Sequence, residues 1–267
     1  MAIPKALTIA GSDSGGGAGI QADLKTFFAH GVYGMSVITA VTAQNTQAVT
    51  AVEVFKGSFV LAQLEAVFSD LGVDAAKTGM LANAEIIETI SDYLKNQKLK
   101  RLVVDPVMIS KSGHPLLEQE ASEALIKKLL PLALVATPNL FEAERVTGKK
   151  ITSKDDMKEA AKFFFEIGVA FPIIKGGHLK DMPAVDILYD GKNFYEWESP
   201  RLTTKHTHGT GCTFSAAITA LLSKGYEVPQ AVEKAKHYIT GAIATAPGLG
   251  HGFGPVNHFY NTGIPLE

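Results

Sequence analysis

The amino-acid sequence predicts an α/β fold with a mainly parallel central sheet and helices on both of its faces. Short apolar runs alternate along the chain with stretches in which apolar residues recur at helical spacing. The length of 267 residues suits a single α/β domain. Hydrophobic residues make up 46% and charged residues 19% of the chain, which supplies a sizeable core and argues against disorder.

The first half of the chain contains four predicted strands separated by helical stretches. The strands span residues 5–10, 36–43, 75–78 and 102–104. Apolar residues at helical spacing lie from Ile20 to Phe28, from Leu61 to Phe68 and from Ile86 to Leu94. We expect Asn83 to cap the third of these helices.

The second half continues the alternation and adds a hairpin. Strands are predicted at residues 134–137 and 171–174, with a helix between them that a Ser153/Asp156 capping box begins and Gly168 ends. Residues 185–189 and 194–197 form a predicted hairpin around Asp190-Gly191. Two helices follow. With no linker or repeat, we predict one domain over residues 1–267.

Glycine or polar residues stand at or just after the ends of the six predicted strands that precede the hairpin. They are Gly11, Gln44, Lys77, Asp105, Asn139 and Lys175. In open α/β sheets, ligands bind beyond the carboxyl ends of the strands. We therefore expect these residues to gather around one site.

Charge and composition exclude several classes of function. The net charge of −2 offers no basic surplus for a nucleic-acid partner. No apolar run reaches the ~18 residues that a membrane span requires, and the first residues do not resemble a signal peptide. The single cysteine, Cys212, cannot form an internal disulfide, so we expect a cytoplasmic protein.

The segment 208–213, His-Gly-Thr-Gly-Cys-Thr, precedes a helix rich in small residues. Small residues that open a helix expose its unpaired N–H groups, which bind anions. In a kinase such a turn would hold the transferring phosphoryl group. The alternative is a tight loop before a closely packed helix, and the segment alone leaves both open.

The glycine-rich loop 11–19 raises a rival function. Residues 17–22 fit the dinucleotide pattern G-x-G-x-x-[G/A] of NAD-dependent oxidoreductases. That fold needs an acidic residue at the end of the second strand, where this chain has Ala43-Gln44. The loop also lacks the Gly-Lys-Ser/Thr of a Walker A loop. We interpret it as a loop that lets a substrate approach the backbone.

Four further polar residues have both a functional and a structural interpretation. Asp105 at a strand end could hold Mg²⁺ or make a loop hydrogen bond. Asn139 and Glu142 lie one turn apart, which suits a ligand site but also an ordinary helix cap. Lys175 suits a nucleotide phosphate or is a solvated lysine beside a turn.

Taken together, these segments resemble the ribokinase superfamily and, within it, the hydroxymethylpyrimidine/phosphomethylpyrimidine kinases of thiamine biosynthesis. The resemblance covers essentially the whole chain. The matching segments are residues 7–13, 18–23, 42–46, 77–80, 105–108, 137–139, 175–178 and 207–213.

The resemblance implies a ribokinase-like kinase domain over residues 1–267. It implies ATP-dependent phosphorylation of 4-amino-5-hydroxymethyl-2-methylpyrimidine and then of its monophosphate, with Mg²⁺. Members of this group are often dimers, so the resemblance also allows a homodimer.

Residue roles follow from the same resemblance. Gln44, Asp23, Met80 and Gly11 would bind the pyrimidine. Lys175, Asn139, Glu142 and Thr210 would bind ATP, with Asp105 and Glu142 on Mg²⁺. Gly209, Gly211 and Cys212 would form the catalytic anion hole. The Gln44 amide presents a donor and an acceptor side by side, as an aminopyrimidine edge requires.

Cys212 departs from the wider superfamily, in which most sugar and nucleoside kinases carry an aspartate base at this position. An unperturbed thiol is only a few per cent thiolate at pH 7. A helix N-terminus lowers the pKa of a cysteine. The sequence therefore leaves open whether Cys212 is a general base, a positioning residue or a small packing residue.

Two alternatives remain open. A pyridoxal or pyridoxine kinase shares the family, but its pyridine ring lacks the donor–acceptor pair that Gln44 matches. A non-catalytic vitamer-binding protein would keep the fold. The retained Asp105, Glu142 and Lys175 argue against it.

Overall fold

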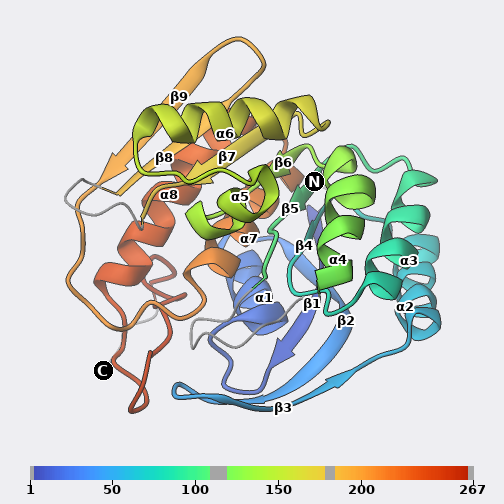
Figure 1. Cartoon of the computed structure of the whole chain (residues 1–267). Coiled ribbons are helices and arrows are strands. Elements are labelled where there is room, and N and C mark those ends of the chain that lie inside the picture. Colours follow the sequence, from blue (N-terminus) through green and yellow to red (C-terminus); the bar gives the residue numbers. More distant parts are fainter. Residues whose placement is uncertain (1–2, 109–118, 178–183, 264–267) are drawn as a thin grey trace.

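The computed structural model describes residues 3–108, 119–177 and 184–263. His178, at the end of one matching segment, lies outside these residues. Within them the chain forms one nine-stranded sheet in the order β3-β2-β1-β4-β5-β6-β7-β8-β9 (Figure 1). The strands are β1 (Lys5–Asp13), β2 (Tyr33–Gln44), β3 (Val49–Val54), β4 (Ala75–Thr78), β5 (Leu102–Val104), β6 (Val135–Ala136), β7 (Phe171–Lys175), β8 (Ala184–Tyr189) and β9 (Phe194–Ser199).

The sheet is parallel in its centre and antiparallel at its two edges. β2, β1, β4, β5, β6 and β7 pair in parallel, while β3 at one edge and β8 and β9 at the other are antiparallel. In the centre of the sheet, Leu7 of β1 lies opposite Met35 of β2 and Ala76 of β4. The predicted mainly parallel sheet is confirmed.

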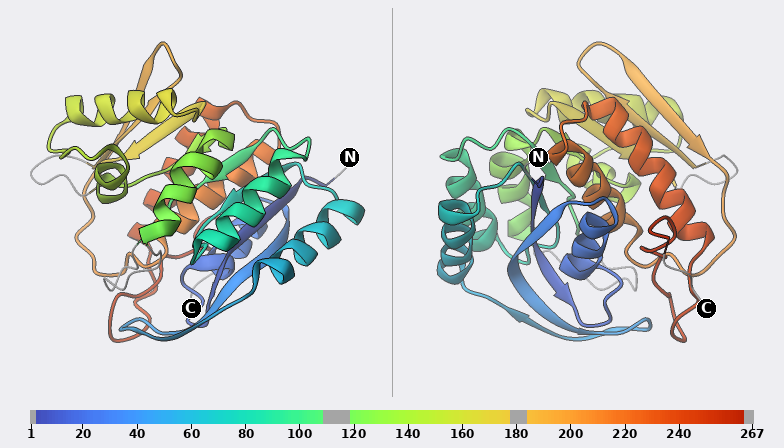
Figure 2. Two further views of the ribbon diagram at one scale, coloured as in Figure 1. Left: turned by 45° about the vertical axis from the view of Figure 1, so that its right-hand side comes forward. Right: turned by 180° about the vertical axis from the view of Figure 1, so that it is seen from behind.

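Helices cover both faces, as the sequence predicts. They are α1 (Gly19–Ala29), α2 (Gly57–Asp70), α3 (Ala84–Lys95), α4 (Gln119–Ala124), α5 (Leu140–Thr147), α6 (Lys154–Glu166), α7 (Thr210–Ser223) and α8 (Val228–Ala244), with short π and 3₁₀ turns at Leu125–Leu129 and Leu130–Leu132. The views in Figure 2 show α1, α7 and α8 on one face of the sheet and α2 to α6 on the other. None of the described helices is long and apolar enough to cross a membrane.

Alternation along the strands fills the two layers of the core. Leu102 and Val104 of β5 pack with the helices on the α2–α6 face, whereas Val103 packs with α7 and α8 on the other. A strand covered on both faces must be apolar at every position. This is why the central strands read as continuous apolar runs in the sequence.

The structure confirms the helix caps that the sequence predicts. Asn83 Oδ1 accepts a hydrogen bond of 3.0 Å from the N–H of Ile86, and Ser153 and Asp156 form the predicted capping box.

The edge strand β3 was not predicted. It lies at the sheet edge with most of its side chains at least partly exposed, so no continuous apolar run marks it.

His258 provides a test of the packing between α7 and α8. Its side chain is 3% exposed, and its Nε2 lies 3.0 Å from Thr213 Oγ1 on α7. Its backbone oxygen accepts a hydrogen bond of 2.9 Å from Tyr238 on α8. Burial, with smaller contributions from Lys25 and His208, lowers the pKa of His258 from 6.5 to about 4.

We predict an acid-dependent loss of stability that His258 causes. The folded pKa lies below the unfolded one, so the unfolded state binds the proton more tightly. The contribution is complete above about pH 6.5 and is lost as the pH falls toward 4, by roughly 3 kcal/mol. Urea unfolding across this range should show the loss in the wild type and in exposed His251→Gln. It should be much smaller in His258→Gln, and an equal loss in that variant would contradict the assignment.

Candidate active site

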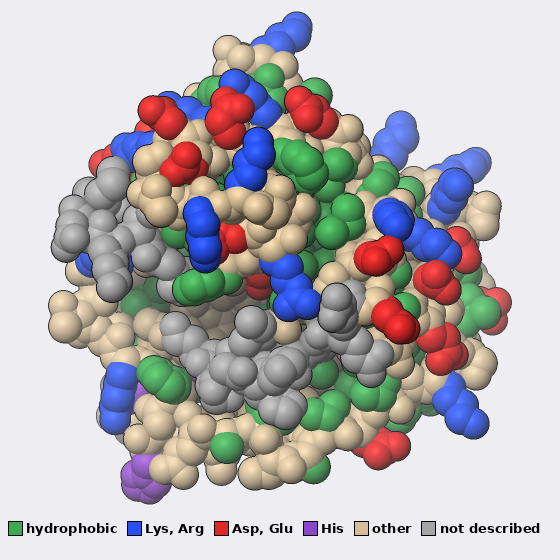
Figure 3. All heavy atoms as spheres, viewed as in Figure 1, with side chains coloured by type: hydrophobic (Ala, Val, Ile, Leu, Met, Phe, Trp, Pro, Cys, Tyr) green, Lys and Arg blue, Asp and Glu red, His purple; other side chains and the backbone are tan. Residues whose placement is uncertain are grey.

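A cavity of about 1030 Å³ lies at the carboxyl ends of the parallel strands. Figure 3 shows the surface hollowed on the face drawn in Figure 1, with hydrophobic and charged side chains along the rim. Of the residues expected to gather after the strands, five line this cavity, and Lys77 is the exception. The five are Gly11, Gln44, Asp105, Asn139 and Lys175. Residues 208–212 at the start of α7 close another wall.

The first turn of α7 opens onto the cavity without a side-chain cap. Gly209 is the N-cap residue and has a φ of 78°, in the left-handed region. A Cβ there would collide with the carbonyl oxygen of Gly17, so only glycine fits. The hydroxyl Oγ1 of Thr210 donates a hydrogen bond of 2.8 Å to the backbone oxygen of Thr207. The N–H of Thr210 donates to the backbone oxygen of Thr207 at 3.3 Å. The N–H groups of Gly211 and Cys212, two residues of the cavity wall, have no acceptor within the helix.

Lys175 and Asp105 form an ion pair beside this turn. Their Nζ and Oδ1 lie 3.2 Å apart, and Thr137 Oγ1 donates to the same Asp105 oxygen at 3.0 Å. A Cβ on Gly211 would lie 3.5 Å from Lys175 Nζ and 3.6 Å from Asp105 Oδ2. A largely buried ammonium, a carboxylate and a helix N-terminus therefore meet at one point. The ammonium and the helix N–H groups can bind an anion there, and the carboxylate can bind a cation that accompanies it.

The electrostatics of the pair are set by burial and mutual attraction. Burial alone would raise the pKa of Asp105, but the charges of Lys175 and Lys77 outweigh it and lower that pKa. Burial likewise opposes the charge on Lys175, whereas Asp105 and Glu142 raise its pKa. Both members of the pair are thus charged at neutral pH.

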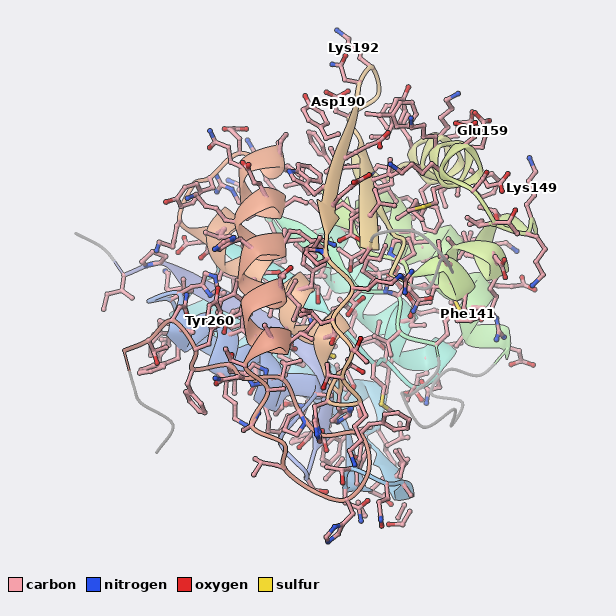
Figure 4. The ribbon with its side chains drawn as sticks, turned by 90° about the vertical axis from the view of Figure 1, so that its left-hand side faces the viewer. Phe141, Lys149, Glu159, Asp190, Lys192 and Tyr260 are labelled. Carbon is pink, nitrogen blue, oxygen red and sulfur yellow. The ribbon has the colours of Figure 1, made fainter. Side chains whose placement is uncertain are left out.

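Asn139 and Glu142 begin α5 and also line the cavity. Asn139 Oδ1 accepts 3.0 Å from the N–H of Glu142, and Glu142 Oε2 accepts 2.8 Å from the N–H of Asn139. This capping box confirms the structural interpretation of Asn139. Nearby on α5, Phe141 is 63% exposed at the rim of the cavity (Figure 4).

Glu142 carries a buried carboxyl group whose negative charge the neighbouring Lys175 only partly compensates. Burial raises its pKa to about 7, and the charge of Asp105 adds to this effect, although Lys175 opposes it. Within the described residues, no three His, Cys, Asp or Glu side chains cluster as a preformed metal site. Mg²⁺ needs only one or two carboxylates when phosphate oxygens and water complete its shell. The oxygens of Asp105 and Glu142 fit that requirement.

Gln44 and Met80 lie at the other end of the cavity. Gln44 ends β2, with its Oε1 3.1 Å from Thr42 Oγ1 and its Nε2 3.4 Å from His208 Nε2. A Cβ on Gly11 would lie 3.1 Å from Met80 Sδ, so these two residues form adjoining parts of one wall. This end therefore combines an amide with apolar and backbone surface.

Asp23 does not line the cavity, and its expected role in binding is wrong. It lies on the inner face of α1 with no exposed surface. Its Oδ1 pairs with Lys77 Nζ at 2.8 Å, and its Oδ2 accepts 2.6 Å from Thr8 Oγ1. Lys77 is equally buried, so the expectation that it reaches the site with the other strand-end residues is also wrong. A buried ammonium requires a paired anion, which Asp23 supplies.

Cys212 lines the cavity, and its surroundings disfavour a thiolate. Burial raises the pKa of Cys212 to about 12, and the charges of Asp23 and Asp105 add to the rise. Lys77 and a hydrogen bond from the Gly19 backbone oppose it without overcoming it. The thiol is therefore neutral near pH 7, mainly because it is buried.

Two residues at the site were missed by the sequence reasoning. Asp13 and His208 both line the cavity and contact each other, with His208 Nε2 2.8 Å from Asp13 Oδ2. Both belong to segments that the sequence singled out for their glycines. An aspartate inside a glycine-rich loop is a signal, because its carboxylate can bind the N–H groups that such a loop exposes.

Comparisons with known proteins agree on one family. The model of the phosphomethylpyrimidine kinase family matches residues 13–257. A hydroxymethylpyrimidine/phosphomethylpyrimidine kinase of Rhizobium meliloti is 53% identical over 258 residues, which cover 96% of this chain and 97% of the relative. The thiamine biosynthesis bifunctional protein ThiED of Geobacter sulfurreducens is 51% identical over 94% of this chain, but the chain spans about half (51%) of that relative's length.

A solved structure extends the likeness to three dimensions. The ADP complex of Bacillus subtilis pyridoxal kinase superimposes with a TM-score of 0.92 and 45% identity. The match covers 98% of this chain and all of that one. Sequence relatives thus carry a pyrimidine-kinase name, while a close structural neighbour carries a pyridoxal-kinase name.

Gly209→Ala tests the geometry of the anion site. An alanine at this φ costs about 1–2 kcal/mol, and its Cβ must also displace the Gly17 carbonyl. We predict a lower unfolding temperature and at least a tenfold loss of nucleotide affinity, measured by circular dichroism and calorimetry. Gly177→Ala is the control, because a Cβ on this cavity residue would meet nothing within 4 Å. Equal effects of both changes would contradict the account.

Proposed function

Because this chain belongs to the phosphomethylpyrimidine kinase family, we propose that its cavity is where the chain phosphorylates 4-amino-5-hydroxymethyl-2-methylpyrimidine, and then the monophosphate, with ATP. The products serve thiamine biosynthesis. The observation that carries the assignment of the site is the meeting of Lys175, Asp105 and the uncapped start of α7 at one wall of the cavity.

The nucleotide occupies the α5 and β7 side in this proposal. Lys175, Asn139 and Thr210 line that side and would face the phosphates. Asp105 and Glu142 would hold Mg²⁺, which supplies charge neutralisation for the phosphate oxygens when it is bound. In this arrangement the bound cation would compensate the charge of the buried Glu142 carboxyl, whose pKa is raised to about 7.

The pyrimidine occupies the Gln44 end, between Gly11 and Met80. Its hydroxymethyl oxygen attacks the γ-phosphorus, a new O–P bond forms, and the bond to the ADP oxygen breaks. The N–H groups of Gly211 and Cys212 stabilise the negative charge on the transferring oxygens. Phosphoryl transfer through a loose transition state depends mainly on positioning and charge stabilisation. The alcohol's proton is then released to solvent with the product.

A pyridoxal or pyridoxine kinase is the second candidate, favoured by the likeness to the Bacillus subtilis pyridoxal kinase structure. Gln44 argues for the pyrimidine, whose ring nitrogen and amino group match the amide. A product assay by ³¹P NMR with the pyrimidine alcohol, its monophosphate and pyridoxal in parallel separates the candidates. We expect both pyrimidines to be phosphorylated faster than pyridoxal, and a preference for pyridoxal would overturn the proposal.

Two properties of the protein in the cell belong to the same proposal. We place the reaction in the cytoplasm, where ATP is abundant and the free Cys212 stays reduced. The resemblance also allows a homodimer, which we include in the proposal. The β2–β3 ribbon would suit the contact, because Val41 and Val54 are exposed there. Sedimentation of the purified chain tests the second point, and a monomer at micromolar concentration would contradict it.

Glu142→Gln should raise the Mg²⁺ concentration that gives half-maximal activity, on the order of tenfold, because a hard cation prefers a charged oxygen ligand. The Michaelis constant for the pyrimidine should change little. Glu144→Gln is the matched control on the same helix, since Glu144 pairs with Lys150 outside the cavity. An unchanged Mg²⁺ dependence in Glu142→Gln would exclude this carboxyl from the metal site.

Cys212→Ala distinguishes positioning from base catalysis. The monophosphate's attacking oxygen is largely ionised at pH 7 and needs no base, whereas the alcohol's is not. Since the pKa of Cys212 is raised to about 12, we predict that both transfers slow by a similar factor, less than about tenfold. Initial rates for the two substrates measure this. A selective loss of ~10²–10⁴-fold for the alcohol would instead show that Cys212 is a general base.

A further inference from the structure

Asp13 and His208 form a buried pair that joins the glycine loop to the start of α7. Asp13 Oδ2 accepts from the N–H groups of Gly17 at 3.1 Å and Ala18 at 2.9 Å, and its Oδ1 accepts from Gly15 at 2.8 Å. His208 Nε2 lies 2.8 Å from the same Oδ2. One carboxylate thus fixes both the loop and the imidazole.

The pair determines where the imidazole carries a proton. Burial opposes the charge on Asp13, but the hydrogen bonds from His208 and the loop N–H groups lower the pKa of its carboxyl. An ionised carboxylate only accepts hydrogen bonds. His208 Nε2 must therefore carry a hydrogen and act as a donor.

The hydrogen on His208 Nε2 is donated to Asp13 at 2.8 Å, and one end of the Gln44 amide lies 3.4 Å from the same nitrogen. That end of the amide can only take the weaker branch of a shared hydrogen bond. An N–H group repels another donor and attracts an oxygen. The position facing His208 thus favours the amide oxygen, although an amide's oxygen and nitrogen occupy nearly the same space and can exchange by a half-turn.

The contacts of Thr42 favour the same orientation of the Gln44 amide, independently of His208. Its Oγ1 lies 3.0 Å from the backbone oxygen of Ser12 and 3.1 Å from the other end of the Gln44 amide. The hydroxyl has one hydrogen. The Ser12 oxygen can only accept, whereas the amide can present either its oxygen or its NH₂ group to Thr42. Both contacts are hydrogen bonds only when the hydroxyl hydrogen goes to Ser12 and Thr42 accepts from the amide NH₂ group.

We propose that His208, held by Asp13, is a positioning residue that turns the Gln44 amide so that its oxygen faces His208 and its nitrogen faces Thr42. This orientation decides which way round the pyrimidine binds. The statement about how the pyrimidine binds rests on the proposed function, whereas the statement about the Gln44 amide concerns the free protein alone.

The order of the substituents on the pyrimidine ring determines how the orientation of the Gln44 amide affects binding. On the pyrimidine, the 4-amino group is next to the 5-hydroxymethyl group, and ring nitrogen N3 is next to the 2-methyl group. The amide oxygen on the His208 side accepts from the amino group, and the amide nitrogen donates to N3. The hydroxymethyl group then lies on the His208 side, beside Gly209 to Cys212. The opposite orientation would place the methyl group there.

NMR of the ligand-free protein tests the amide orientation directly. We expect nuclear Overhauser effects between the side-chain NH₂ protons of Gln44 and the methyl group of Thr42, and none to the ring protons of His208. Effects to the His208 ring without effects to Thr42 would overturn the proposal. This measurement requires no activity, so it stands even if the substrate assignment fails.

A substrate analogue without the 4-amino group tests the consequence. In the wild type, its removal should lower kcat/KM on the order of 10–100-fold. In His208→Leu the amide is no longer fixed, and the same removal should cost only a few-fold. Exposed His237→Leu is the control and should retain the full loss. A full loss in His208→Leu would reduce His208 to a packing role. Failure of the wild type to phosphorylate the parent pyrimidine would instead contradict the proposed function.

Discussion

The unpaired N–H groups at the start of α7 are the feature on which the rest of the site depends. Gly209 lets the chain enter the helix from the left-handed region while it touches Gly17, so no side chain covers the helix end. Lys175 at the end of β7 and Asp105 after β5 reach the same turn from either side of β6. A glycine loop, a helix end and an ion pair thus form one surface, which a parallel sheet assembles because its strands end along one edge.

The buried charges beneath this surface do not balance. Lys77 and Lys175 supply two positive charges, and Asp23, Asp105 and Glu142 supply three carboxyl groups. Burial is the main cause of the raised pKa of Glu142, and the charge of Asp105 adds to it. Buried ion pairs contribute little to stability on balance, and perturbed carboxyl groups in a cavity are typical of functional sites. A divalent cation brought in with ATP would relieve the imbalance.

Much of the fold and the site could be predicted from the sequence, because both follow from local patterns. Continuous apolar runs mark the buried strands, and the residues that end them lie together, as Gln44, Asp105 and Lys175 do. What failed depends on tertiary contacts. The burial of Asp23 follows from its pairing with Lys77, which lies 54 residues away. The raised pKa of Cys212 follows from burial under α1, where the helix N-terminus alone suggested the opposite.

The central claim is that the start of α7 receives the transferring phosphoryl group. Backbone amide chemical shifts, recorded while a non-hydrolysable ATP analogue and Mg²⁺ are added in the presence of the pyrimidine, test it most directly. The account predicts that the largest shifts fall on the amides of Gly211 and Cys212, since their N–H groups gain an anionic acceptor. Saturating nucleotide binding that leaves these two amides unshifted would contradict it.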